Sequence, residues 1–150
     1  MIASVLSTKY NVLKTEGNFN SEIGAPLTAL KVNSSHEMAV IEMGMDHMGE
    51  IYNISKIIKP DTAVITNIGV AHIEHLKTRE NILKAKTEVF ENMKENGVAV
   101  LNKDDDMLVT IDNDMDKIWY GYSEEADVRA VSVDINQTEG IVKATFVING

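Results

Sequence analysis

The sequence predicts an α/β domain of three layers, in which helices cover both faces of a mainly parallel sheet with an antiparallel edge hairpin. Up to about residue 122, short continuous apolar runs alternate with helical patterns, which is typical of buried parallel strands and their crossover helices. From residue 128 onward, apolar and polar residues alternate instead, which favours antiparallel strands. A length of 150 residues with 44% hydrophobic content indicates one domain with an unaided core.

The first half of the chain contains the clearest strand and helix patterns. Ile2, Val5 and Leu6 form an apolar stripe, as if the chain entered a helix midway, so we expect a truncated domain. The runs 38–43 and 62–67 predict two buried parallel strands. Between them, isoleucines at helical spacing in 49–59 end at Pro60, which predicts a crossover helix and hence a βαβ unit.

The second half continues the pattern and then changes it. Residues 79–94 predict a helix with i,i+4 pairs of opposite charge, ended by Gly97, and 97–101 predict a further buried strand. A short helix through Ile111 and a strand over 117–122 are expected next. The acidic run 104–106 fits helix-start and turn carboxylates. Alternation over 128–148, around Thr138-Glu139-Gly140, predicts the edge hairpin.

Composition excludes several classes of protein. With 23 acidic against 14 basic residues the net charge is -9, which argues against a nucleic-acid-binding module. No window of 18 apolar residues occurs, so we expect no membrane insertion and a cytoplasmic location. The absence of cysteine removes thiol catalysis and Fe–S chemistry. No glycine is followed by lysine, so these residues encode no P-loop to hold ATP phosphates.

Polar side chains follow the two predicted parallel strands at the point where each ends. Glu42 closes one strand, and Asn67 closes the other and leads into a loop that carries His72. Ligands of open α/β sheets bind beyond the carboxyl ends of the strands, so Glu42 and His72 could converge on one cleft and hold a divalent metal. The alternative is that Glu42 caps a helix and His72 is an ordinary loop histidine.

Lys86 lies in the middle of the apolar stripe of its predicted helix, beside Ile82, Ala85 and Val89. An ammonium facing a core is costly, so its pKa should fall or its head should reach an anion. A neutral amine can also add carbon dioxide and become a carboxylate-like metal ligand. The alternative is snorkelling, in which the stem covers apolar surface and the head reaches water.

Five segments taken together resemble the central domain of the Mur ligases, over residues 1 to about 122. Within that family they are most similar to the members that add D-alanyl-D-alanine to the UDP-N-acetylmuramoyl-tripeptide of peptidoglycan synthesis. The segments are Thr15-Glu16-Gly17-Asn18-Phe19-Asn20, Glu42-Met43-Gly44-Met45, Ile65-Thr66-Asn67-Ile68-Gly69 with Ala71-His72-Ile73-Glu74, Lys84-Ala85-Lys86, and Leu101-Asn102-Lys103-Asp104-Asp105.

The resemblance implies an ATP-dependent amide ligase that passes through an acyl phosphate and uses Mg²⁺. It implies that Glu42 and His72 are magnesium ligands and that Lys86 is a carbamylated lysine, so that these three are the catalytic and metal residues. It places Asn18 near the phosphates and the acyl substrate. Thr15, Asn20 and Asn67 are expected to line the same region as further substrate-binding residues.

The resemblance also implies what these 150 residues lack. The ATP loop, the amino-terminal UDP-binding domain and the carboxy-terminal domain are expected outside them. We therefore expect a partial central domain that is inactive alone. Two alternatives stay open: another Mur or folylpolyglutamate-type ligase, and a non-catalytic acidic binding module.

Overall fold

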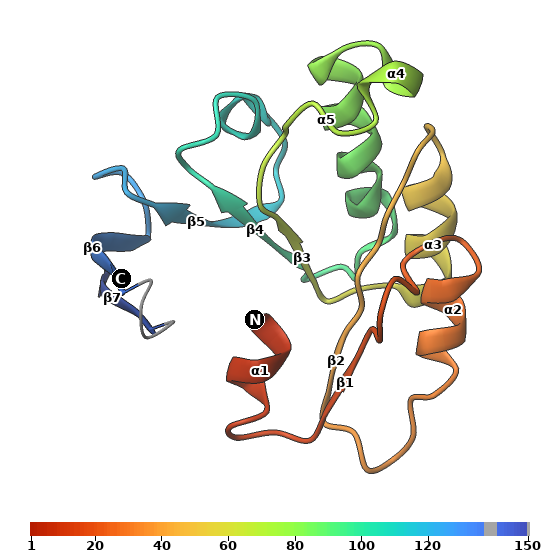
Figure 1. Ribbon diagram of the computed structural model, residues 1–150. Coiled ribbons are helices and arrows are strands. Elements are labelled where there is room, and N and C mark those ends of the chain that lie inside the picture. The colour runs from red at the N-terminus through yellow and green to blue at the C-terminus, as the bar shows by residue number, and fades with distance from the viewer. Residues whose placement is uncertain (137–140, 150) are drawn as a thin grey trace.

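The strands form two sheets within residues 1–136 and 141–149, which the computed structural model describes (Figure 1). In the small sheet, β1 (Val12–Lys14) pairs in parallel with β2 (Met38–Val40). The large sheet has the order β3-β4-β5-β6-β7, with β3 to β6 parallel and β7 antiparallel to β6. Its strands are β3 (Thr62–Ile65), β4 (Val98–Asn102), β5 (Asp116–Gly121), β6 (Val128–Asn136) and β7 (Ile141–Ile148). The predicted mainly parallel sheet and edge hairpin are confirmed, while the turn signal at 138–140 lies outside the described residues.

One feature differs from the expected single sheet. The two strands of the predicted βαβ unit, β2 and β3, lie in different sheets and are connected by α3 (Glu50–Ile58). Each pairs along one edge only among the described residues, β2 with β1 and β3 with β4. A crossover helix leads the chain back to a parallel strand, but it does not require the two strands to be neighbours.

Helices lie on both sides of the strands, as predicted. In Figure 1, α1 (Ile2–Leu6) lies on one side of β1 and β2, and α2 (Gly24–Ala29) and α3 lie on the other. α4 (Ile73–Leu76) and α5 (Arg79–Thr87) follow β3, and 3-10 turns occur at η1 (Glu88–Asn92) and η2 (Leu108–Thr110). Among the described residues, every helix is too short and too polar to cross a membrane.

The helix expected over 79–94 is shorter than predicted. α5 ends at Thr87 and the chain continues as the 3-10 turn η1. At this junction the Glu88 carboxylate accepts hydrogen bonds from the backbone N–H groups of Gly49 at 2.7 Å and Tyr52 at 3.1 Å, at the start of α3. Glu88 therefore serves as a cap for another helix, since those N–H groups have no partner within α3.

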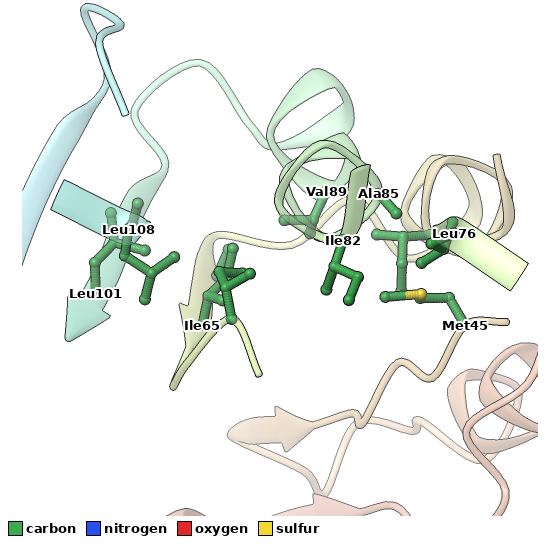
Figure 2. Close-up of a cluster of buried hydrophobic side chains, with 12 residues drawn as sticks. Met45, Ile65, Leu76, Ile82, Ala85, Val89, Leu101 and Leu108 are labelled. Atoms are coloured by element: carbon green, nitrogen blue, oxygen red, sulfur yellow. The ribbon is translucent and has the colours of Figure 1, made fainter. Parts of the chain in front are cut away.

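The main core lies between the large sheet and the helices that follow β2 and β3. Figure 2 shows Ile65 and Leu101 of β3 and β4 beside Leu108 of η2, with Ile82 and Ala85 of α5 farther along the same cluster. All five are at most 6% exposed. This packing fixes β3, β4 and α5 relative to one another, and so fixes the loop that leaves the carboxyl end of β3.

Candidate functional site

Glu42 is held by two side chains that the sequence assigns to substrate binding. Its backbone N–H donates to Thr15 Oγ1 at 2.8 Å, and its carboxylate Oε1 accepts from Asn20 Nδ2 at 2.8 Å. The backbone N–H of Gly44 donates to the Asn20 carbonyl at 2.7 Å. A Cβ at Gly44 would come within 3.0 Å of the Asn20 amide, so glycine leaves room for that side chain. Asn18 lies exposed in the turn just before.

His72 is joined to the loop that follows β2. Its Nδ1 lies 2.6 Å from Oδ1 of Asp46, and the two side chains are 44% and 60% exposed. His72 has φ 63°, in the left-handed region, where it precedes α4. Its carbonyl accepts from the N–H groups of His75 and Leu76. Because a non-glycine residue there is strained, the surrounding contacts have to hold it.

Asp46 is itself fixed by the start of α3. The Glu50 carboxylate accepts from the N–H groups of Asp46 at 2.6 Å and His47 at 3.1 Å. Partial burial acts to raise the pKa of Glu50, but these backbone hydrogen bonds and His47 hold it below its ordinary value. The rings of His47 and His75 also meet, with centroids 4.7 Å apart. The loops after β2 and β3 are therefore in contact at several points.

Lys86 does not pair with a carboxylate, which corrects the expectation of a Glu42 partner. Its Nζ donates to the backbone carbonyl of Asn67 at 2.8 Å, and the side chain is half-buried. Lys86 lies on the face of α5 that supports the loop after β3, so this carbonyl is within its reach. Burial lowers the pKa of Lys86, and the charge of Asp105 opposes that effect.

The loop after β3 is clamped at Ile68, which is 1% exposed. Its N–H donates to Asp105 Oδ2 at 2.8 Å, and its carbonyl accepts from Arg79 Nε at 3.0 Å and Nη2 at 2.8 Å. Arg79 also binds Asp106, with Nη1 2.8 Å from Oδ2. Sequence reasoning missed Asp105 and Arg79, because neither forms a local pattern with Ile68.

These contacts divide the predicted site residues into two groups. Thr15, Asn20 and Glu42 are in contact after β1 and β2, and Asn67 and Lys86 are in contact after β3. His72 belongs to the second loop and reaches the first through Asp46. Among residues 1–136 and 141–149, three His, Cys, Asp or Glu side chains nowhere form a ready metal site.

The donor chemistry nevertheless fits a divalent metal shared with another ligand. Glu42 supplies an exposed carboxylate, and His72 has one ring nitrogen directed to Asp46, which leaves the other for a metal. Lys86 would join them only as its carbamate, since an ammonium has no lone pair to donate.

The fold and these loops define an α/β domain that collects polar side chains beyond the carboxyl ends of parallel strands, the usual place for ligands in this class. The family model of the Mur ligase middle domain matches residues 1–149. This chain belongs to the Mur ligase family.

Curated relatives are named UDP-N-acetylmuramoyl-tripeptide–D-alanyl-D-alanine ligase. The chain is 49% identical to the Bacillus subtilis protein over 108 residues, which are 72% of this chain and 24% of that protein. It is 39% identical to the Escherichia coli protein over 104 residues, 69% of this chain and 23% of that one. The chain therefore spans about a quarter of the length of these relatives.

Solved structures agree with this assignment. A Thermotoga maritima MurF ligase in complex with ADP matches with a TM-score of 0.83 and 34% identity, over 97% of this chain and 34% of that one. An Acinetobacter baumannii MurF matches with a TM-score of 0.83 and 31% identity, over 98% and 34%. A Lactobacillus-type folylpolyglutamate enzyme, titled L. casei FPGS, matches at 14% identity with a TM-score of 0.65, which shows a shared fold alone.

Proposed function

We propose that this chain is the central domain of an ATP-dependent ligase that joins D-alanyl-D-alanine to the UDP-N-acetylmuramoyl-tripeptide. The observation that carries the proposal is the 49% identity to a curated ligase with that name over 72% of this chain. A reaction on a nucleotide-linked precursor with ATP also favours a cytoplasmic location. The folylpolyglutamate alternative has only a similarity of fold in its favour.

The reaction has two steps. The terminal carboxylate of the tripeptide attacks the γ-phosphorus of ATP, which forms an acyl phosphate and releases ADP. The amine of the dipeptide then attacks the acyl carbon, loses a proton and expels phosphate, which leaves a new amide bond. Mg²⁺, when bound, would neutralise phosphate charge during these steps.

Glu42 and His72 are the proposed magnesium ligands of this chain. Asn20 orients the Glu42 carboxylate, and Thr15 fixes the Glu42 backbone, so both act by positioning that ligand. Asn18 is proposed to lie near the phosphates and the acyl substrate, and Asn67 to line the same region. The short span relative to the relatives supports the proposal that the ATP loop and the two flanking domains belong to residues outside these 150.

Lys86 is the proposed carbamate. Its neutral amine would attack carbon dioxide, forming an N–C bond and losing a proton, which converts a cation into an anion. Burial favours the neutral amine, because it lowers the pKa of Lys86. Without metal, we expect an unmodified Lys86.

The test is phosphate release by the full-length protein that carries this domain. Release should require ATP, Mg²⁺, D-alanyl-D-alanine and the UDP-tripeptide together. Glu42→Gln should lower kcat by at least about tenfold through loss of a metal ligand, whereas the exposed Glu95→Gln should have no effect. A different amino acid that supports the reaction better than D-alanyl-D-alanine would refute the proposed substrate, and a fully active Glu42→Gln would refute the metal role.

A further inference from the structure

Asp46 makes a short contact with His72 that the sequence did not predict. The Asp46 Oδ1 to His72 Nδ1 distance is 2.6 Å. An ionised carboxylate only accepts hydrogen bonds, so Nδ1 must carry the proton in this contact. In a neutral imidazole the other nitrogen, Nε2, then has no proton and keeps its lone pair. That is the form of histidine able to bind a cation through Nε2.

Asp46 is well placed to impose this form because its own position is fixed. Its backbone N–H donates to the Glu50 carboxylate at 2.6 Å, and the next N–H, from His47, donates to the same oxygen at 3.1 Å. Glu50 belongs to the first turn of α3, whose neighbour Ile51 is in the core at 4% exposed. The carboxylate of Asp46 therefore extends from a braced loop and not from a free one.

His72, in contrast, has little support of its own. It is 44% exposed and has a left-handed backbone, φ 63°, which costs free energy for a residue other than glycine. A ring this exposed has several rotamers within reach, so an isolated side chain would turn between them. The contact with Asp46 selects one ring orientation and one tautomer together.

We infer that Asp46 is a positioning residue that orients the His72 ring and keeps Nε2 free of a proton, ready for a divalent cation. The inference rests on the metal role of His72 given under the proposed function. Asp46 would not itself contact the cation. Outer carboxylates that hold a metal-binding histidine in this way change metal affinity by about 10- to 100-fold when removed.

Nitrogen-15 NMR of the imidazole rings of the full chain tests the inference. At about pH 9, where an ordinary imidazole is neutral, the His72 Nε2 signal should have the shift of an unprotonated nitrogen and Nδ1 that of a protonated one. Asp46→Ala should abolish this preference, and Asp46→Asn should restore much of it because the amide oxygen can still accept from Nδ1. Asp46 is 60% exposed, so the variants should fold, which unchanged amide signals of buried Ile54 and Ile82 would verify.

The matched control is the other histidine–carboxylate contact of the same loop. His75 Nε2 lies 3.6 Å from Glu74, and Glu74→Ala should leave the His72 signals unchanged. A protonated Nε2 in the unsubstituted chain, or an unchanged His72 tautomer in Asp46→Ala, would overturn the positioning role.

Mn²⁺ added alone provides the second measurement, through paramagnetic broadening of the His72 signals. Broadening should occur in the unsubstituted chain and require about 10- to 100-fold more Mn²⁺ in Asp46→Ala. If Nε2 carries no proton and Mn²⁺ still leaves the His72 signals sharp, the metal role of His72 fails, and with it this inference. The tautomer and broadening readouts thus distinguish failure of the positioning role from failure of the proposed function.

Discussion

Replacing Asp105 with alanine should both destabilise the domain and loosen the loop after β3. The Asp105 carboxylate accepts from three backbone N–H groups, those of Ile68 at 2.8 Å, Met107 at 3.0 Å and Leu108 at 2.9 Å. The last two belong to the start of η2, and the first belongs to a buried residue 37 positions earlier in the chain. One side chain therefore joins the loop that carries Asn67 to the end of β4.

The expected cost follows from the two kinds of contact. A hydrogen bond from a largely buried N–H to a charged acceptor contributes about 1.5–3 kcal/mol, and the Ile68 contact is of this kind. Capping of a helical turn contributes about 1 kcal/mol, which is the estimate for the two contacts at η2 together. Asp105→Ala should thus lower the free energy of unfolding by about 3 kcal/mol.

Urea unfolding followed by fluorescence of Trp119, the one tryptophan of the chain, measures this cost. With a slope of about 2 kcal/mol per molar urea, the midpoint should fall by about 1.5 M. Asp105→Asn keeps one acceptor oxygen and should lie between the two. The exposed Asp112→Ala should change stability by less than about 0.5 kcal/mol. A midpoint for Asp105→Ala equal to that of Asp112→Ala would refute the reasoning.

Three further substitutions or measurements test other parts of the structure. Gly24→Ala would place a Cβ 2.6 Å from the backbone of Phe19, so it should cost about 1–3 kcal/mol in a thermal melt and shift the amide signals of the adjoining turn; a melt like that of the unsubstituted chain would contradict the close approach. Glu88→Gln removes one charged acceptor at the start of α3 and should cost about 1 kcal/mol, with hydrogen exchange fastest at Gly49; unchanged exchange there would show that Glu88 is not the cap. Burial lowers the pKa of Lys86, so its Cε signal should titrate below the ordinary range of lysine, and folding should become more favourable as pH rises from that lowered pKa to the unfolded one; titration in the ordinary range would disprove the burial effect.

Strands and amphipathic helices were predictable where a local pattern is strong. The runs at 62–67 and 97–101 contain β3 and most of β4, since a strand buried on both faces must be continuously apolar. The helix expected over 49–59 is α3, Glu50–Ile58, because Pro60 sets its end. In contrast, α2 was missed, since Gly24-Ala25-Pro26 has no apolar periodicity and the helix forms against its neighbours.

Contacts between distant residues account for the features that were not predictable. Nothing local in β2 or β3 specifies which strand pairs with its edge, so the division into two sheets was invisible. The rule that ligands gather beyond strand ends led to Glu42 and Asn67. It could not lead to Asp46 or Asp105, because an acidic residue in a loop has many ordinary uses and only the fold shows which backbone or ring it meets.

The separation of β2 from β3 has a consequence for how the domain opens and closes. Glu42 follows the small sheet, and Asn67 and His72 follow the large one, with no ladder of backbone hydrogen bonds between β2 and β3 in the described residues. Side-chain contacts such as Asp46–His72 join the two, and these break more easily than a ladder. Amide exchange should therefore resolve two cooperative units, each opening without the other. A ligand that touches Glu42 and His72 together would merge them into one unit, and the rigidity of the pair would become part of its binding free energy.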